Sequence, residues 1–566
     1  MFKYTHHNAE LNIKNVGEKV ALKGWVNKKR NLGGLIFIDL RDRKGMTQLL
    51  AKPESPVYEL VNQVKNEYVI EVKGVVLERE SKNKDLATGE IEIEIEEINI
   101  LNTAETTPIT ITEHDNVSEE VKLKYRYLDL RKPSQQNYLF TRSLISQSIR
   151  RTLLGNDFTE LETPYLVKST PEGAKEFLVP SRLYSGEAYA LAQSPQIFKQ
   201  LYMIAGFEKY FQFARCFRDE DGRADRQLEF TQVDIEASFI DQDDIMGLSE
   251  KVISNMFKDV LGKELPLPLK RMTYAEAFDK YGSDKPDTRY ELFIENFTEK
   301  FSGYHLPTMV EGDVLRGFTL KNDALFTRKY FDKLTEIVKK NHGKALLYLK
   351  NEAGVLSGSI AKAVEGFVLE EGTLLILVPG NYEDATNALG AIRKVIAKDL
   401  NMVDENLDNV LWVYDFPLLE YNAEEERFYA RHHPFTSPKN VDDLKNNPKE
   451  ALAKAYDLVW NGYEVGGGSI RIYRQDVQSL MFETLGFSEQ EIINKFGFFV
   501  DALKYGTPPH GGIAFGLDRL VMLATHTDNI KDVIAFPKTQ SARDLMMQSP
   551  APIEEKQWND LNLKVK

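Results

Sequence analysis

The stretch FRDEDGRADRQLEF, residues 217–230, places a dense charge cluster between two segments that resemble buried strands. Five acidic residues and three arginines fall within its fourteen positions. The apolar segment FQFARC (211–216) precedes it, and FTQVDIEASF (230–239) continues from its end. Solvated charge runs rarely lie so tightly between two such strands, so the stretch is either a decorated hairpin or the centre of a site.

The strand after the cluster separates apolar from polar side chains. With a period of two, one face carries Val233, Ile235 and Ala237, and the other carries Gln232, Asp234 and Glu236. If the polar face lines a cleft, Arg218 can grip a phosphate while the carboxylates hold a metal ion or an amine.

Length and composition predict a globular protein with several domains. The chain has 566 residues, too many for one core, so we expect three or four domains. It has no apolar run of about 18 residues and no apolar core near its start, so neither a membrane span nor an export signal is expected. The single Cys216 fits a reducing cytoplasm, and no pair of Cys or His has zinc-ligand spacing, so zinc is not expected.

Charge is unevenly distributed along the chain. The net charge of −14 argues globally against a nucleic-acid partner. Residues 1–50, however, carry ten Lys or Arg and only four Asp or Glu. A basic module on an acidic body can bind nucleic acid locally, and chance fluctuation in charge is the alternative.

Residues 20–101 predict an OB barrel. Candidate strands lie at 20–29, 34–42, 45–51, 68–80 and 91–101, with a short helix at 55–66. Five strands with a helix after the third is the order of that barrel, which commonly binds single-stranded nucleic acid over aromatic and basic side chains. Phe37 and the run Lys28, Lys29 and Arg30 supply both kinds, whereas Trp25 is expected in the core.

The rest of the chain divides at changes in pattern. A helix at 144–155 has Ile145, Ile149 and Leu153 on one stripe, and a strand (158–164) follows it and ends at Pro164. These two elements form either a subunit contact or simple core packing. The turn-rich GSDKPDT (282–288) introduces mixed helix and strand, which we regard as an inserted α+β domain. The predicted segments are a barrel (1–103), a linker (104–134), a core domain in two parts (135–283 and 409–550), the insertion (284–408) and a tail (551–566).

Two polar segments precede the charge cluster. KSTPEGAKEF (168–177) is a loop with Glu172 between turn residues, and an exposed loop acid is the alternative. In AQSPQIFKQLYM (192–203), Ser194 is predicted to cap a helix with Pro195 at its first position. Gln196 and Lys199 then share one face near a helix N-terminus, a favourable place for an anion, and a solvated helix start is the alternative.

A hairpin near the end of the chain brings two carboxylates together. In YDLVWNGYEVGGGSIR (456–471) the turn Asn461-Gly462 pairs Trp460 with Tyr463, Val459 with Glu464 and Asp457 with Gly466. Asp457 and Glu464 become diagonal neighbours on one face, where they can share Mg²⁺. The glycines leave that face bare for a flat ligand, and Arg471 joins it only if the glycine run contains a bulge.

Taken together, the polar segments resemble a known family. FRDEDGRADRQLEFTQVD is similar to the second signature of class II aminoacyl-tRNA synthetases, and GGIAFGLDRL (511–520) to the third. The helix and strand that end at Pro164 resemble the first, which builds the dimer interface of that family. STPEGA, QSPQIFKQL, HHPFTSP, NGYEVGGGSIRI and IAFPKTQSA resemble the bacterial-type aspartate ligases within it. The resemblance covers essentially the whole chain.

The resemblance implies a fold and a reaction. The fold is α+β, with an antiparallel catalytic sheet flanked by helices, an N-terminal OB barrel and an inserted domain. Aspartate reacts with ATP, accompanied by Mg²⁺, to give aspartyl-adenylate and pyrophosphate, and the aspartyl group then passes to the 3′ end of tRNA-Asp. The implied enzyme is a cytoplasmic homodimer. One alternative is a variant that also charges tRNA-Asn, which Leu32 argues against. A second is an asparaginyl-tRNA synthetase. The third is a non-catalytic nucleic-acid-binding paralogue, which the intact motifs argue against.

The resemblance also implies a role for individual residues. Aspartate would be bound by Glu172, Gln196, Lys199, Arg218, Asp234, His432 and Arg471. ATP would be bound by Arg218, Asp219, Glu220, Gln227, Phe230, Glu464, Gly516, Leu517, Asp518 and Arg519, with Arg218 and Arg519 catalytic and Phe230 under the adenine. Mg²⁺ would be held by Asp457 and Glu464. The anticodon would be read by Arg30, Phe37 and Gln48, with Leu50 where relatives often have an aromatic residue.

The charges of these residues give a physical reason for the implied substrate. Cations that face the side chain of aspartate are left unpaired if asparagine enters. A site of that kind can reject the analogue by roughly 10⁴–10⁵. No general base is needed, because the attacking carboxylate is ionised at pH 7.

Overall fold

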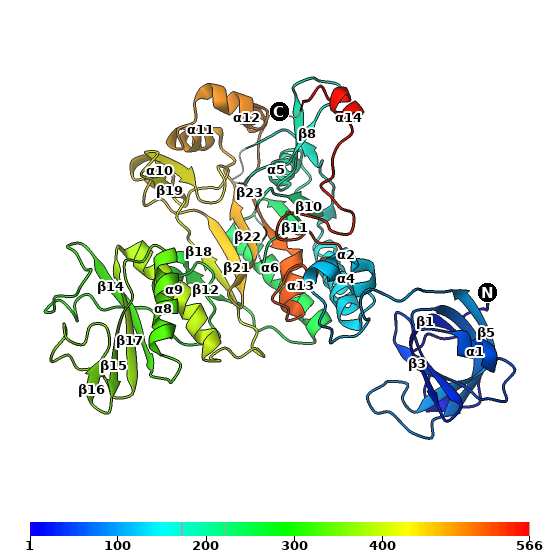
Figure 1. Cartoon of the computed structure of the whole chain (residues 1–566). Coiled ribbons are helices and arrows are strands. Elements are labelled where there is room, and N and C mark those ends of the chain that lie inside the picture. Colours follow the sequence, from blue (N-terminus) through cyan, green and yellow to red (C-terminus); the bar gives the residue numbers. More distant parts are fainter. Residues whose placement is uncertain (171–173, 221, 223, 565–566) are drawn as a thin grey trace. The chain divides into compact units, whose positions relative to one another are not determined.

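The computed structural model describes residues 1–170, 174–220, 222 and 224–564. The chain forms two compact units, Met1–Gln136 with Leu545–Met547, and Asn137–Asp544 with Gln548–Lys566 (Figure 1). In the described part of the chain, no helix has both the length and the apolar character needed to cross a membrane.

The first unit contains a closed five-stranded barrel, as predicted. Its strands, in order around the barrel, are β1 (Lys19–Leu32), β2 (Leu35–Arg41), β3 (Met46–Ala51), β5 (Ile91–Asn102) and β4 (Val69–Glu78). Helix α1 (Tyr58–Gln63) follows β3. Alternate residues of β2, Ile36, Ile38 and Leu40, fill the interior, which leaves the intervening side chains on the outer face.

Two features of this unit were not predicted. Trp25, expected in the core, is 37% exposed, and the Arg131 guanidinium lies 5.7 Å from its ring centroid. The segment after the barrel forms helices α2 (Glu119–Lys124) and α3 (Arg126–Asp129). Lys132 is buried between Asp115 and Asp129, at 2.5 and 2.7 Å. The pair with Asp129 is local, three residues along the chain, whereas the pair with Asp115 spans 17 residues and is not encoded by the local pattern of hydrophobic residues.

The second unit is built on a mixed eight-stranded sheet. Its strands, in spatial order, are β12 (Lys270–Thr273), β18 (Val410–Tyr414), β21 (Ala455–Trp460), β22 (Tyr463–Ile470), β23 (His510–Gly516), β11 (Glu229–Ser238), β10 (Lys209–Phe217) and β6 (Thr159–Glu160). The β12–β18 and β10–β6 pairs are parallel, and the six strands from β18 to β10 are antiparallel to their neighbours. The strand predicted at 158–164 is present at the edge of this sheet but is confined to Thr159–Glu160.

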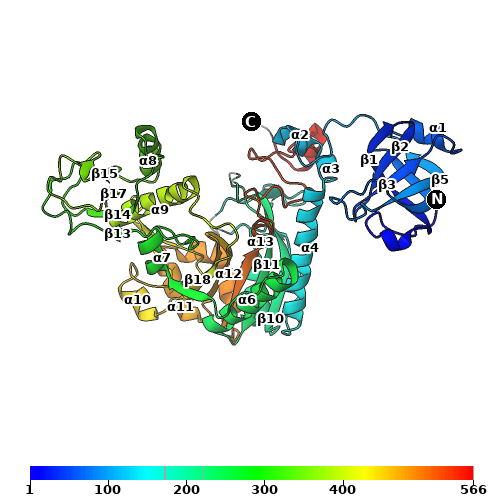
Figure 2. The same cartoon turned by 90° about the horizontal axis from the view of Figure 1, so that it is seen from below.

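Three helices cover one face of this sheet (Figures 1 and 2). They are α4 (Pro133–Leu154), α6 (Gln242–Met256) and α13 (Leu517–Ala524). Ile145, Ile149 and Leu153 form the predicted stripe and are wholly buried in the core beneath the sheet. Burial of each such side chain contributes about 1.5–3 kcal/mol. The packed helices cover this face of the sheet, which leaves the opposite face for the site.

The inserted segment has a sheet of its own. Its strands, in spatial order, are β13 (Glu295–Asn296), β14 (Val314–Lys321), β17 (Thr373–Gly380), β15 (Leu347–Glu352) and β16 (Val355–Ser357). Helices α8 (Arg328–Lys340) and α9 (Tyr382–Asp399) pack on one face, and loops fill the other. The α+β character predicted for this segment is confirmed.

Shorter elements complete the second unit. Helices around the site are α5 (Gln196–Ile204), α7 (Tyr274–Tyr281), α10 (Val441–Asn446), α11 (Gln475–Thr484) and α12 (Glu489–Ala502), with a π-helical turn at Phe257–Leu261 and α14 (Glu555–Asp560) near the end of the chain. Small sheets are formed by β7 (Leu166–Val167), β9 (Ala188–Leu191) and β8 (Leu178–Pro180), and by β19 (Leu419–Asn422) with β20 (Arg427–Ala430).

Candidate active site

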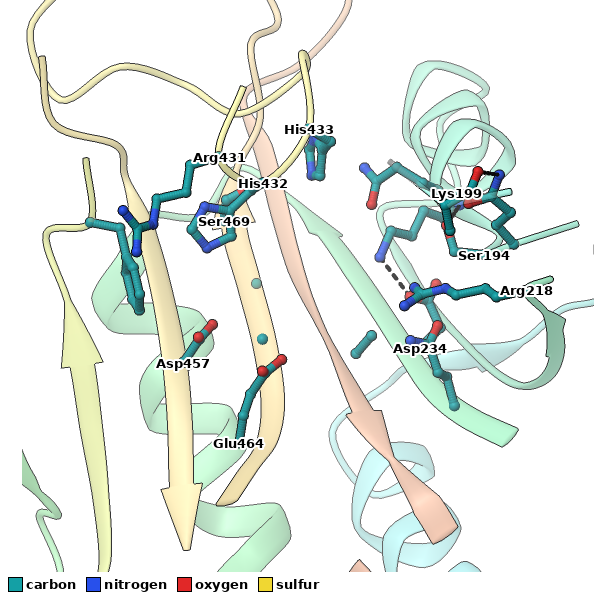
Figure 3. Close-up of a pocket in the computed structure, with 18 of the residues that line it drawn as sticks. Ser194, Lys199, Arg218, Asp234, Arg431, His432, His433, Asp457, Glu464 and Ser469 are labelled. Carbon is teal, nitrogen blue, oxygen red and sulfur yellow. Dashed lines mark hydrogen bonds and ion pairs between the residues drawn. The ribbon is translucent and has the colours of Figure 1, made fainter. Parts of the chain in front are cut away.

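Two adjoining cavities open on the face of the eight-stranded sheet that the helices leave free. The larger cavity has a volume of about 440 Å³ and the smaller about 200 Å³. Arg218, Glu220, Gln232 and Glu464 line both. The charge cluster lies between the paired strands β10 and β11, and its residues Arg218 and Glu220 line both cavities, so it belongs to a hairpin and also borders the candidate site. Figure 3 shows side chains from both sides of this opening.

The predicted polar face of β11 lines the larger cavity. Gln232 and Asp234 reach it, while Val233, Ile235 and Ala237 are buried in the core on the other side of the sheet. The separation of the two faces predicted from the period of two is confirmed.

A bulge in β22 decides which residues of the glycine hairpin face the cavity. Trp460 pairs with Tyr463 and Val459 with Glu464, as predicted, but Asp457 pairs with Gly467 and not with Gly466. The extra residue reverses the alternation of β22 after Glu464. Consequently Gly467, Ser469 and Arg471 line the larger cavity together with Glu464. The predicted register was therefore wrong beyond the first pairs after the turn. Arg471 faces the cavity because β22 contains the bulge on which its place in the site depended.

Asp457 and Glu464 converge over one glycine. A Cβ atom built on Gly467 would lie 2.9 Å from Asp457 Oδ1 and 3.2 Å from Glu464 Oε1. Figure 3 shows both carboxylates turned toward the same opening. Burial, and then the neighbouring Glu464, raise the pKa of Asp457 well above its ordinary value. The pair therefore favours a cation, and two carboxylates that leave room for a substrate phosphate suit Mg²⁺.

The start of α5 differs slightly from its prediction. The helix begins at Gln196 and Pro195 is its N-cap residue, so the predicted cap at Ser194 is one position too early. Ser194 Oγ still accepts from the backbone N–H of Gln196 at 3.3 Å. Gln196 and Lys199 are both buried and both line the larger cavity, so the solvated-helix alternative is wrong.

Lys199 and Arg471 meet at a buried acid cluster. Lys199 Nζ lies 2.6 Å from Asp234 Oδ1 and 3.2 Å from Glu236 Oε2. Arg471 donates from Nε and Nη2 to the two oxygens of Glu236, at 2.9 and 3.1 Å. All four side chains are almost wholly buried. Two positive side chains from distant parts of the chain thus share one carboxylate.

Glu236 changes the electrostatic argument made from the sequence. The two cations are already paired with two carboxylates, so asparagine would not leave them without any partner. Burial alone would raise the pKa of Glu236, but Arg471 and Lys199 outweigh it and lower the pKa to about 2. Selection of aspartate over asparagine would then depend on the type of hydrogen bond. Lys199 and Arg471 present N–H donors; both oxygens of a carboxylate accept from them, whereas the NH₂ group of an amide cannot.

Two histidines complete this wall. His432 lines the larger cavity, and burial lowers its pKa to about 4, so its ring is neutral at pH 7. Arg471 Nη1 lies 2.8 Å from His433 Nε2. Arg471 Nη1 also donates to Ser469 Oγ, at 2.6 Å. Burial lowers the pKa of His433 well below its ordinary value. These partners hold the guanidinium of Arg471 in one orientation.

Several buried polar atoms at the larger cavity have no hydrogen-bond partner among the described residues. They are Gln196 Nε2, Arg218 Nε, Asp234 Oδ2 and His432 Nδ1. Buried polar atoms are rarely left unpaired, so such a group commonly marks a ligand site. A carboxylate acceptor beside amide and guanidinium donors matches the amino and carboxylate groups of an α-amino acid.

The smaller cavity has the features of a nucleotide pocket. Phe230, Gly516 and Arg519 line it, and Arg519 Nε has no partner in the described part of the chain. The Arg218 guanidinium lies 5.1 Å from the Phe230 ring centroid. Gln227 is fixed by two hydrogen bonds to the backbone of Lys538, at 3.0 and 3.2 Å. An aromatic ring and a guanidinium over a glycine-edged floor can hold a flat base.

Some predicted site residues lie elsewhere. Leu517 is buried in the core beneath the sheet, and Asp219 lines neither cavity, while its N–H donates to the carbonyl of Lys175. Asp518 lines the smaller cavity, but its carboxylate is occupied by Arg142 and by the N–H of Thr231. Glu172 lies outside the described residues.

Sequence reasoning missed several residues of the larger cavity. They are His433, Ser469, Arg431 and Asp284. Arg431 and His433 stand inside RHHPFT beside His432, and a search of whole motifs would have included them. Asp284 belongs to GSDKPDT, which was regarded only as a break in the pattern.

The predicted anticodon residues share the outer face of the barrel. Arg30 Nη2 lies 2.7 Å from Asp39 Oδ1 and 3.1 Å from Gln48 Oε1. Phe37 pairs with Arg30 on β1 and with Leu50 on β3, so the three positions are adjacent. Phe37 is half-buried and Leu50 is buried.

Comparison with protein families gives two matches. The family described as tRNA synthetases class II (D, K and N) matches residues 118–540, and an OB-fold nucleic acid binding domain matches residues 20–101.

Full-length relatives are similar over the whole chain. Aspartate–tRNA ligase of Aster yellows witches'-broom phytoplasma is 50% identical, with 100% of this chain and 99% of that protein covered. Aspartate–tRNA(Asp/Asn) ligase of Caldanaerobacter subterraneus is 48% identical, with 100% and 98% covered.

Solved structures have a similar fold. Asparaginyl-tRNA synthetase of Pyrococcus horikoshii with asparaginyl-adenylate matches with a TM-score of 0.61 and 20% identity, over 95% of this chain and 99% of that one. Aspartyl tRNA synthetase of Entamoeba histolytica matches with a TM-score of 0.60 and 20% identity, over 94% and 91%.

Proposed function

This chain belongs to the class II tRNA synthetases, in the group described by the letters D, K and N, and we propose that it is an aspartate–tRNA ligase. The observation that carries the proposal is the convergence of Lys199 and Arg471 on one buried cluster, in a chain about half identical to aspartate–tRNA ligases over its full length. In the first step, a carboxylate oxygen of aspartate attacks the α-phosphorus of ATP and pyrophosphate leaves. In the second, the 3′-terminal hydroxyl of tRNA attacks the activated carbonyl and AMP leaves.

Aspartate binding follows from the unpaired atoms of the larger cavity. Asp234 Oδ2 accepts from the α-amino group, and Gln196 and Arg218 donate to the α-carboxylate. Lys199 and Arg471 donate to the side-chain carboxylate, and His432, neutral at pH 7, contributes a further polar contact. Glu172 is proposed beside the amino group on the strength of the motif alone.

ATP binding is assigned to the smaller cavity. The adenine ring lies between Phe230 and Arg519, and the floor is the strand that ends at Gly516. Glu220 and Gln227 border the base, and Arg218, which lines both cavities, reaches the α-phosphate. The proposal does not use the side chains of Leu517 and Asp219.

Asp457 and Glu464 are proposed to hold the Mg²⁺ that accompanies ATP. Their convergence over Gly467 supports this assignment, because only a glycine leaves their oxygens room for an ion. When bound there, Mg²⁺ would neutralise charge on the triphosphate. Zinc has no assigned role.

Catalysis is attributed to positioning and to fixed cations. The attacking carboxylate is already ionised at pH 7, so no side chain has to remove a proton in the first step. Arg218 borders both cavities and can bind the α-carboxylate and the α-phosphate together, which brings the reacting atoms into contact. Its charge also stabilises the negative charge that develops at phosphorus.

The barrel is proposed to read the anticodon of tRNA-Asp. Phe37 offers a ring for base stacking beside Arg30 and Gln48, and stacking of this kind is worth about 1–3 kcal/mol per base. The buried Leu50 beside it cannot supply a second aromatic platform.

The enzyme is proposed to work as a homodimer in the cytoplasm, where tRNA and ATP are available. Helix α4 buries one stripe in its own core, but Phe140 and Leu144 on the same helix are 47% and 50% exposed. The neighbouring β6 is the free edge of the sheet. An exposed apolar helix face beside an open edge fits a subunit contact, and light scattering on the purified protein tests it.

Aminoacylation of purified tRNAs tests the proposed function. Charging of tRNA-Asp with aspartate is expected, and no charging of tRNA-Asp would contradict the assignment. The relatives are named both as tRNA-Asp and as tRNA(Asp/Asn) ligases, so tRNA-Asn is run in parallel. Leu32 lies exposed at the end of β1, and we propose on this residue that tRNA-Asn is not charged.

A further inference from the structure

The turn that leads into the inserted segment brings a lysine to the carboxylates of the active site. Lys285 Nζ lies 3.4 Å from Glu464 Oε2 and 3.3 Å from Asp284 Oδ2, and Asp284 lines the larger cavity. We propose that Lys285 is a positioning residue of the nucleotide–metal site and that the inserted segment holds it there. The proposal rests on the proposed function, since it takes Asp457 and Glu464 to be the carboxylates that meet ATP with its metal ion.

Three carboxylates of the larger cavity interact with Lys285, and Arg431 lines the same cavity. Asp284, Asp457 and Glu464 all line the larger cavity. A triphosphate that approaches three carboxylates is repelled unless a cation offsets part of their charge. Lys285 lines neither cavity, but its ammonium pairs with Glu464 and Asp284, which line the larger one, and so offsets their charge. It lowers the repulsion between Glu464 and ATP, and it competes with a free metal ion for Glu464.

The inserted segment fixes the backbone around Lys285 through a buried arginine. Arg393 of α9 is 1% exposed and donates to the carbonyls of Leu292, Asp287 and Tyr290, at 2.7, 3.1 and 3.3 Å. Its guanidinium also lies 4.1 Å from the Tyr290 ring centroid. The side chain of Arg393 thus binds three backbone carbonyls in residues 287–292, the segment that follows Lys285.

Close backbone packing fixes the other end of the turn. Gly282 has a φ of +62°, and a Cβ atom on it would lie 2.4 Å from the carbonyl oxygen of Thr386 in α9. A Cβ atom on Gly390 would lie 2.1 Å from the carbonyl oxygen of Gly282. The turn therefore rests directly on the backbone of α9, and neither glycine can be replaced without displacing it.

The opposite side of the turn contacts the catalytic hairpin. A Cβ atom on Gly462, in the turn between β21 and β22, would lie 3.0 Å from Cβ of Asp287. Asn409 Nδ2 donates to Thr288 Oγ1 at 3.2 Å. The segment that carries Lys285 is thus held between α9 and the hairpin that carries Asp457 and Glu464. This arrangement gives the inserted segment a part in substrate binding.

Two binding measurements on Lys285→Met test the role of the ammonium. The first is the Kd of a non-hydrolysable ATP analogue in EDTA, by calorimetry; the second is the Kd of Mn²⁺ without nucleotide, by electron paramagnetic resonance. Loss of one positive charge at this partly exposed site is expected to weaken binding of the ATP analogue about tenfold and to strengthen binding of Mn²⁺ about tenfold. Lys285→Arg keeps the charge and should stay within about threefold of the wild type in both. The matched control is Lys280→Met, an exposed lysine of α7 that, unlike Lys285, has no ion pair with a described residue of either cavity.

Opposite shifts of the two constants separate this role from a structural one, because a loosened site would bind both ligands more weakly. Unchanged constants, or a loss of both, would overturn the proposal. If the wild type fails to bind the ATP analogue with Mg²⁺ present, the proposed function fails and not this inference alone.

Two variants of α9 test the contribution of the inserted segment. Gly390→Ala and Arg393→Lys are expected to shift the Mn²⁺ affinity in the same direction as Lys285→Met. Circular dichroism selects the variants that fold, and Arg393→Lys is the milder of the two. A folded variant of either kind with wild-type Mn²⁺ and nucleotide affinity would show that Lys285 does not depend on α9.

Discussion

Replacement of Arg471 by leucine removes one of the two cations to which we attribute the proposed selection of aspartate. The guanidinium is 2% exposed and is bound through Glu236, Ser469 and His433, so its position is fixed before substrate arrives. Truncation of one partner of a buried, hydrogen-bonded charge pair costs about 2–5 kcal/mol. At 1.4 kcal/mol for each factor of ten, kcat/KM for aspartate is expected to fall by about 30- to 4,000-fold.

ATP binding provides the internal control for this variant. Arg471 does not line the smaller cavity, so the Kd for ATP should change by less than about threefold. Lys199 remains 3.2 Å from Glu236, so the carboxylate keeps a cation and the variant should fold. Arg471→Lys retains the charge but not the planar fork and should give an intermediate loss.

The assay is ATP–pyrophosphate exchange with varied aspartate, beside calorimetric titration with ATP and thermal unfolding. Unchanged aspartate-dependent exchange would remove Arg471 from the site. A loss of ATP affinity equal to the loss of exchange would mean that the residue acts on the whole fold and not on aspartate.

Three other predictions address separate parts of the molecule. Phe37→Ala should lower the rate of tRNA charging by about ten- to a hundredfold through lost base stacking while ATP–pyrophosphate exchange is unchanged, and equal loss of both would restrict the barrel to a structural role. Gly467→Ala places a methyl group within 2.9 Å of Asp457 Oδ1 and 3.2 Å of Glu464 Oε1, so the Mg²⁺ concentration for half-maximal exchange should rise severalfold, and an unchanged Mg²⁺ dependence would refute the assigned metal site. His432 has its pKa lowered from 6.5 to about 4 by burial, so between these pH values the unfolded chain takes up a proton that the folded chain does not, and folding stability falls by roughly 3 kcal/mol as pH decreases. His432→Asn should lack this part of the acid destabilisation. If the unfolding midpoint falls by the same amount from pH 7 to acid pH in the variant and in the wild type, the pKa shift is contradicted.

The sequence predicts the parts of the site that depend on local periodicity. Alternation along β11 places Gln232 and Asp234 in the cavity, and the Asn461-Gly462 turn fixes the first pairs of its hairpin. Both follow from a side-chain period of two, which short stretches of sequence reveal. The stripe of α4 is predicted for the same reason.

Features that depend on distant partners were missed. The position of the β22 bulge, and with it the register of Asp457, is set by pairing with strands on both sides of β22. Glu236 was placed on the polar face without a role, because its partners Lys199 and Arg471 come from remote segments. Trp25 was assigned to the core by residue type, although its contact is with Arg131.

Turn-rich segments concealed another part of the site. GSDKPDT has no periodicity and reads as a boundary, yet it places Asp284 on the larger cavity and Lys285 beside Glu464. Functional residues are common on such connections, because a rigid scaffold on either side can position them. Here α9 and the β21–β22 hairpin supply that scaffold.

Parallel ATP–pyrophosphate exchange with L-aspartate and with L-asparagine measures the substrate selection of the site itself. Lys199 and Arg471 present only N–H donors to the substrate side chain, so the account predicts that kcat/KM for aspartate exceeds that for asparagine by about 10⁴ or more. Equal or faster exchange with asparagine would contradict it.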